Sequence, residues 1–136
     1  MTLKEILQKI NKIKNKIMGL QKELQKQKMR ELIARIASQY EIDPIKVIKV
    51  AENESKLDPN CRSRNKDRRK TLDRGLFQLN DYWYRHIPDD CAYNPECATK
   101  VFCNAVKNKK VTDWYGAKGV YWIYKIIDGK KKAVLL

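Results

Sequence analysis

The chain has 136 residues, of which 43% are hydrophobic, enough for one modest core and too few for a second full domain. Thirty Lys and Arg against 16 Asp and Glu give a formal net charge of +14, which favours polyanionic partners: nucleic acid, acidic lipid or the anionic polymers of a bacterial wall. No apolar run approaches the ~20 residues of a membrane span, so we predict no transmembrane segment.

Residues 1–30 differ in pattern from the rest of the chain. Their apolar residues recur with alternating gaps of three and four, which is an a/d heptad seam: Leu3, Ile6, Ile10, Ile13, Ile17, Leu20 and Leu24. This predicts either an amphipathic helix packed on its own domain or a short coiled coil that forms a homo-oligomer through residues 3–27. The segment also carries nine of the 30 Lys and Arg but two of the 16 acids, so a helix on a membrane surface is a third interpretation, which the narrow seam disfavours.

The helical pattern continues over residues 30–40 and restarts after a break. Asp43 suits an N-cap and Pro44 the first position of a helix over 44–56, which Pro59 prevents from continuing. Residues 60–74 are polar and basic, with seven Lys and Arg, and predict a loop or short β-excursion attracted to anionic polymers. We expect three parts: a basic helix or coiled coil over 1–30, one domain over 31–128 and a C-terminal tail over 129–136.

A further helix is predicted to begin at Asn94 and Pro95, which look like N-cap and first helical position. Its apolar stripe has helical spacing: Ala98, Val101, Phe102, Ala105 and Val106. Residues 114–127 are aromatic and apolar, and we expect them to form a final helical or irregular layer.

Four cysteines in a short chain suggest disulfides and an oxidising location. Cys97 and Cys103 would lie about 9 Å apart along one helix, beyond disulfide reach. Cys91 precedes that helix, so Cys91–Cys97 is the expected bridge, and Cys61 and Cys103 either pair with each other or stay free. A zinc site from these cysteines and His86 would need unusual spacing, so we predict no metal and no cofactor.

Glu54 shares a face of the predicted helix 44–56 with Val47 and Val50, which lie seven and four positions before it. If these valines face the core, Glu54 lies at its edge, near the helix C-terminus. Partial burial and the helix dipole both raise a carboxyl pKa there, and a protonated glutamic acid can donate its proton to a leaving oxygen. Glu52 lies about 200° away around the helix and is interpreted as surface charge. Alone, this segment also fits an ordinary helix-end glutamate.

The segment TLDRGLFQLN, residues 71–80, supplies a second acid. Asp73 precedes Gly75 in a polar, Arg-rich surrounding that favours its ionised form, and Gln78 and Asn80 are polar groups able to bind a ligand or hold the turn. Glycoside hydrolysis needs such a pair: one carboxyl of raised pKa and one carboxylate facing the developing oxocarbenium ion. The alternative for Asp73 is a turn residue that caps nearby N–H groups.

Together these motifs resemble the lysozyme superfamily, both animal-type lysozymes and the soluble lytic transglycosylase domains of bacteria and phages. The resemblance runs over about residues 31–125 and rests on Glu54-Ser55 at a helix end, followed by Asp73-x-Gly75-Leu76-Phe77-Gln78-Leu79-Asn80. It implies an α+β, predominantly α, two-lobed fold with a small β-element and a cleft. It also implies cleavage of the β-1,4 bond between N-acetylmuramic acid and N-acetylglucosamine, and hence a peptidoglycan partner.

The resemblance assigns roles to individual residues. Glu54 takes the position of the general acid and Asp73 that of the second carboxylate, which many lytic transglycosylases lack; Asp73 therefore favours hydrolysis with retention over 1,6-anhydro formation. The expected substrate-binding residues are Ser55, Gln78, Asn80, Tyr82, Trp114 and Tyr115, with core packing as the alternative for Trp114. Ala92-Tyr93-Asn94 departs from the transglycosylase pattern Ala-Tyr-Asn-x-Gly because Pro95 follows, and we interpret it as a helix cap.

Two other classes of function fit the same sequence. One is a basic coiled-coil protein that binds nucleic acid, although no helix-turn-helix, zinc-finger or RNP motif is present. The other is an adaptor that binds glycan without cutting it. For the enzyme we expect action outside the cytoplasm, in the cell wall or periplasm, or delivery by a phage. The N-terminus, MTLKEILQKI, lacks the apolar centre of a secretory signal peptide, so we expect another exit route: phage lysis, delivery in a virion or a leader outside this sequence.

Overall fold

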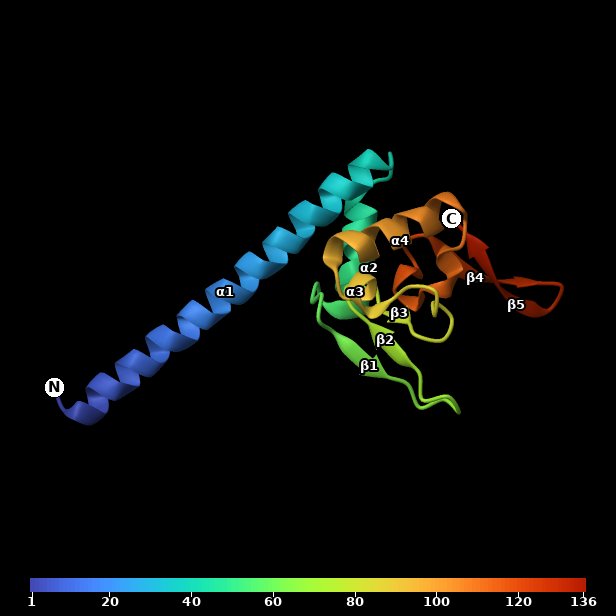
Figure 1. Ribbon diagram of the computed structural model, residues 1–136. Coiled ribbons are helices and arrows are strands. Elements are labelled where there is room, and N and C mark those ends of the chain that lie inside the picture. The colour runs from blue at the N-terminus through green and yellow to red at the C-terminus, as the bar shows by residue number, and fades with distance from the viewer.

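The computed structural model describes residues 1–136 and has a long helix projecting from a domain of helices, a small sheet and a hairpin (Figure 1). The predicted α+β, predominantly α fold is confirmed. No helix is both long enough and apolar enough to pass through a bilayer. The elements in order are α1 (Leu3–Gln39), α2 (Pro44–Ser55), β1 (Arg62–Arg64), β2 (Leu72–Arg74), β3 (Leu79–Asn80), α3 (Asp89–Ala92), α4 (Pro95–Lys107), the 3₁₀ helices η1 (Val111–Asp113) and η2 (Tyr115–Ala117), β4 (Trp122–Ile127) and β5 (Lys130–Leu135).

Helix α1 is continuous, and only its C-terminal part packs on the domain. Its start is capped by the Thr2 hydroxyl, which accepts the N–H of Glu5 at 3.2 Å. The seven seam residues are between 41% and 72% exposed, so the interpretation that this seam packs on its own domain is wrong. From position 29 onward the apolar face is buried against α2 and α4 through Met29, Ile33, Ile36 and Ala37.

The predicted helix starts at residues 43–44 and 94–95 are confirmed. The Asp43 carboxylate accepts the N–H of Ile45 at 3.0 Å, and the Asn94 side chain accepts the N–H of Cys97 at 2.9 Å. Each helix then begins with proline, whose missing N–H costs nothing at that position. The Asp43 cap fixes where α2 begins, and therefore which of its residues lies at the far end of the helix, beside the sheet.

Strands β1, β2 and β3 form an antiparallel sheet in that order, in line with the predicted β-excursion. Between β2 and β3 the chain turns through Gly75, at φ +78°, where a Cβ would lie 1.9 Å from the carbonyl oxygen of Ala92. Leu76 and Phe77 follow and are fully buried, and the Phe77 ring stacks on Phe102 at 4.7 Å. The turn is therefore anchored in the core, which gives Asp73 a fixed position on β2.

Strands β4 and β5 form an antiparallel hairpin that projects from the domain (Figure 1). The prediction of helical or irregular structure over 114–127 is wrong from Trp122 onward, and residues 129–136, expected as a tail, supply β5. The turn is Asp128-Gly129, at φ 52° and 75°. An Asp-Gly pair with positive φ at both residues is a strong hairpin indicator, and the sequence analysis did not use it.

The predicted bridge between Cys91 and Cys97 is confirmed, and it joins α3 to the first turn of α4. Cys61 and Cys103 are free thiols. Burial raises the pKa of the Cys103 thiol to about 11, which keeps it protonated and unreactive near neutral pH.

Candidate functional site

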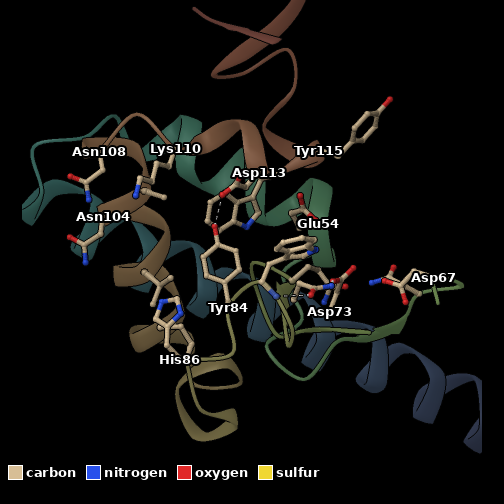
Figure 2. Close-up of a pocket in the computed structure, with 18 residues that line it drawn as sticks. Glu54, Asp67, Asp73, Tyr84, His86, Asn104, Asn108, Lys110, Asp113 and Tyr115 are labelled. Carbon is tan, nitrogen blue, oxygen red and sulfur yellow. Dashed lines mark hydrogen bonds between the residues drawn. The ribbon is translucent and has the colours of Figure 1, made fainter. Parts of the chain in front are cut away.

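A cleft of about 1010 Å³ lies between the sheet and the α4–η1 side of the domain, and Figure 2 shows the side chains around it. Both acids singled out in the sequence, Glu54 from α2 and Asp73 from β2, line this one cleft. Four of the expected binding residues line it as well: Gln78, Asn80, Trp114 and Tyr115.

Glu54 lies in the last turn of α2 with its carboxyl group half-buried. Its Oε1 accepts the backbone N–H of Gly116 at 2.7 Å. Burial raises the pKa of Glu54, the Gly116 hydrogen bond opposes that rise, and the negative charge of Asp73 adds to it, with a net upward shift. The group therefore holds its proton to higher pH than an exposed glutamate does.

Gly116 is a part of the site that the sequence analysis missed. A Cβ at this position would lie 2.5 Å from Glu54 Oε1 and 2.8 Å from Glu54 Cγ, so only glycine lets the carboxyl group rest on this backbone. The Asn53 side chain donates to the Gly116 carbonyl at 2.9 Å from the other side. Residues 53 and 54 thus clamp the η2 backbone to the end of α2, although no local pattern in the sequence relates positions that lie 62 residues apart.

Asp73 is oriented by Asn80, its partner across the β2–β3 ladder. The Asn80 side chain donates to Asp73 Oδ1 at 2.9 Å, while its own oxygen accepts the N–H groups of Tyr82 and Trp83 at 3.0 and 3.1 Å. Asn80 therefore holds the carboxylate and the following turn at once. Its amide nitrogen and oxygen are therefore both engaged in hydrogen bonds within the fold.

The Arg74 side chain does not lie beside Asp73, although the sequence predicted an Arg-rich surrounding for that carboxylate. Strand alternation turns its side chain to the opposite face, where it is 3% exposed. The guanidinium donates to the carbonyls of Leu79, Tyr84 and Ile87 at 3.0 to 3.2 Å and pairs with Asp89 at 2.8 Å. One buried cation thus holds the whole segment between β3 and α3, which forms part of the cleft wall.

Ser55 and Gln78 stabilise the walls of the cleft. Ser55 is 5% exposed, does not line the cleft, and its hydroxyl donates to the Leu76 carbonyl at 2.8 Å, which ties α2 to the β2–β3 turn. Gln78 does line the cleft, but its amide donates to the carbonyls of Gly75 and Cys61 at 2.9 and 3.2 Å. Ser55, which was expected to contact substrate, is instead buried outside the cleft lining, with its hydroxyl bonded to the fold.

Among the aromatic residues that follow the turn, Tyr82 does not line the cleft, contrary to expectation. Its ring contacts the guanidinium groups of Arg69 and Arg85, whose carbons are 4.0 and 5.2 Å from the ring centroid. Trp83 and Tyr84 line the cleft instead, and Trp83 is 67% exposed. The turn is irregular, so neither helical nor strand spacing could indicate which ring faces inward.

Trp114 and Tyr115 are adjacent but differ in their surroundings. Trp114 is 3% exposed and its indole N–H donates to the Phe77 carbonyl at 2.8 Å, so it is a core residue that borders the cleft. Tyr115 is 70% exposed at the mouth of the cleft, where its ring is free to contact a ligand.

The opposite wall carries several polar residues that the sequence did not mark as belonging to the cleft. The Tyr84 hydroxyl donates to Asp113 at 2.9 Å (Figure 2). Burial is the main cause of the raised pKa of Tyr84, and this hydrogen bond adds to it. Further along the wall are His86, Asn104, Asn108 and Lys110. No three His, Cys, Asp or Glu side chains lie close enough together to hold a metal ion.

The model of a family described as a lysozyme-like domain matches residues 34–116, more than half of the chain. The match spans Glu54, Asp73 and Gly116. Neither the curated proteins nor the solved structures contain a match to the chain.

Proposed function

The chain belongs to the lysozyme-like domain family, and from this membership we propose that it cleaves the glycan strands of bacterial peptidoglycan. Peptidoglycan-lytic activity in general is what this family implies. The proposed bond is the β-1,4 bond between N-acetylmuramic acid and N-acetylglucosamine, and the proposed site of action is outside the cytoplasm or at the target of a phage.

Glu54 is the proposed general acid. A half-buried carboxyl group of raised pKa, in the same cleft as a second carboxyl group, is the observation that carries the proposal. Its proton passes to the glycosidic oxygen as the bond to the anomeric carbon breaks, which avoids an alkoxide leaving group. After departure of the leaving sugar the same carboxylate is placed to accept a proton from the attacking nucleophile.

Asp73 is the proposed second carboxylate. Its negative charge faces the oxocarbenium ion that develops at the anomeric carbon, and the hydrogen bond from Asn80 keeps one carboxylate oxygen in place. Attack by Asp73 followed by water gives hydrolysis with retention. Attack by the 6-hydroxyl of the sugar would instead give a 1,6-anhydro product, with no need for Asp73 as nucleophile.

Exposed aromatic rings at the cleft are the proposed sugar contacts. Trp83 and Tyr115 are 67% and 70% exposed and both line the cleft, so each can offer a ring to the apolar C–H face of a sugar. Trp114, Gln78 and Asn80 shape the cleft between Trp83 and Tyr115 through hydrogen bonds within the fold.

The test compares Glu54→Gln with Glu52→Gln on purified cell-wall sacculi. Both changes remove one carboxylate from the same helix, but Glu52 points to Arg30, 3.6 Å away, and does not line the cleft. Release of soluble glycan should fall by at least about 100-fold in Glu54→Gln and stay near wild type in Glu52→Gln. Equal release by the Glu54→Gln and wild-type proteins would refute the assignment. Mass spectrometry of the products separates hydrolysis, which leaves reducing ends, from anhydro formation.

We also propose that α1 self-associates through the seam. Its seven apolar residues repeat with heptad spacing and all remain exposed, and residues 3–24 make about three heptads of coiled-coil surface. Isoleucine at several a and d positions favours bundles of more than two helices. A second copy of the same helix is therefore the proposed partner of this face.

A further inference from the structure

A row of tyrosine and lysine side chains leads from the mouth of the cleft onto the β4–β5 hairpin. Lys118 Nζ lies 5.2 Å from the centroid of the Tyr115 ring and 5.0 Å from that of Tyr124. Lys131 Nζ lies 4.3 Å from the Tyr124 centroid. Tyr115, Lys118, Tyr124 and Lys131 are called the tyrosine–lysine row below, and its first member lines the cleft.

The row rests on a rigid base. Trp122 is 2% exposed and its indole N–H donates to the Trp114 carbonyl at 2.9 Å. Its rings meet those of Tyr115 and Tyr124 edge to face, with centroids 6.4 and 5.0 Å away. The two tyrosines are therefore fixed relative to each other, and to the cleft, through a buried side chain.

The hairpin face that carries Tyr124 is open to solvent. Tyr124 pairs across the strands with Ala133, whose methyl group is too small to cover a ring, and Ile126 pairs with Lys131. Tyr124 and Ile126 are 39% and 72% exposed. Neither Lys118 nor Lys131 pairs with any acid, so both ammonium groups, held beside the rings, are free to meet an outside anion.

We propose that the tyrosine–lysine row is a second binding site, which holds carboxylate groups on an anionic glycan strand where that strand leaves the cleft. The inference rests on the proposed function, because continuity with the cleft is what selects a glycan over other polyanions. Two ammonium groups in sequence along one face fit carboxylates repeated along a strand. Lys118, Tyr124 and Lys131 lie outside the matched residues 34–116, so the row begins in the family domain at Tyr115 and continues beyond it.

The first experiment measures binding without catalysis. Every protein carries Glu54→Gln, and its binding to insoluble sacculi is measured by sedimentation. Each ammonium group lost from the row should weaken binding about two- to fivefold, so Lys118→Ala with Lys131→Ala should show a clear loss. The matched control is Lys125→Ala with Lys132→Ala, a cross-strand pair on the opposite face of the same hairpin. It removes equal charge and should bind as the parent does. Tyr124→Ala should weaken binding, and Tyr124→Phe should not.

The second experiment uses the active protein and two substrate lengths. Tyr124→Ala and the double variant Lys118→Ala with Lys131→Ala should raise KM on sacculi. They should leave turnover of short soluble glycan fragments, which fill only the cleft, unchanged. Equal losses from the two lysine pairs, or undiminished binding to sacculi, would overturn the proposal. So would a row-dependent affinity for DNA or anionic vesicles without one for sacculi. If the active protein cleaves no glycan but its binding to sacculi still depends on the row, this inference stands and the proposed function is wrong.

Discussion

The two parts of helix α1 have similar apolar stripes but different partners. Residues 3–28 leave the stripe exposed, whereas residues 29–39 bury theirs on α2 and α4. The spacing of apolar residues determines which face of a helix is apolar, but what covers that face depends on the rest of the chain. For the second part the partner is the core beneath the cleft; for the first, we propose another copy of the same helix.

The cleft and the apolar seam of α1 share no residues. All residues that line the cleft lie between Glu54 and Tyr115, and none of them belongs to α1. Changes in the cleft should therefore alter cleavage without altering assembly, and changes in the seam should do the reverse. The predictions below test this separation.

The largest effect is expected from Gly116→Ala. The added methyl group would fall 2.5 Å from Glu54 Oε1, so the carboxyl group must move by about an ångström, which should lower the rate of glycan release about 100-fold. Release of glycan from sacculi measures the rate, and thermal unfolding shows whether the fold survives. Wild-type activity in a folded Gly116→Ala protein would show that the clamp does not position Glu54. Self-association should be unchanged.

Ile13→Lys should weaken assembly with no effect on cleavage of a short soluble glycan. Loss of one buried isoleucine removes about 2 kcal/mol per helix, which lowers the association constant about 30-fold for each helix in the assembly. Asn15→Lys is the matched control, because it adds the same charge outside the heptad seam. Analytical ultracentrifugation measures both. Added salt should strengthen assembly, since the basic helices repel one another. If both variants associate equally, the seam is not the interface.

The cleavage rate should fall about tenfold per pH unit above the raised pKa of Glu54, because only the protonated carboxyl group donates. The same shift acts on stability. A carboxyl group whose pKa is raised by folding stabilises the fold below its unfolded pKa, and this contribution is lost as pH rises through the folded pKa. Glu54→Gln should lack that loss, which chemical denaturation across the same pH range measures. Equal pH dependence in both proteins would contradict the burial of Glu54.

The smallest effect is expected from Gly19→Ala in α1. No atom lies within 4 Å of a Cβ at this position, and alanine in a helix interior is favoured over glycine by about 1 kcal/mol. Hydrogen exchange in α1 should slow about fivefold while glycan release stays at the wild-type rate. A slower release would mean that the helix and the cleft are coupled.

Much of the fold follows from local chemistry that a sequence displays. Helix caps at Asp43 and Asn94, and the bridge from Cys91 to Cys97, depend on residues a few positions apart. Glu54 was located because the spacing of Val47 and Val50 gives the face of a regular helix. Such features require only backbone geometry and short-range contacts.

The remainder of the site depends on long-range contacts or irregular backbone. Gly116 matters because η2 packs on the end of α2, which no local pattern encodes. Tyr82 was misplaced because it follows an irregular turn, where side-chain direction has no period. Ser55 was expected at the substrate because of the family pattern, but its hydroxyl is used by the fold.

In the proposed assembly, the continuity of α1 would also limit how neighbouring domains can move. The helix has 37 residues, about 55 Å in length, and it enters the core without a loop or hinge. A bundle of such helices would hold the clefts of neighbouring copies at a fixed distance from one another, whereas flexible linkers would let that distance vary. Avidity for a polymeric substrate then depends on whether that spacing matches the separation of cleavable bonds within the wall.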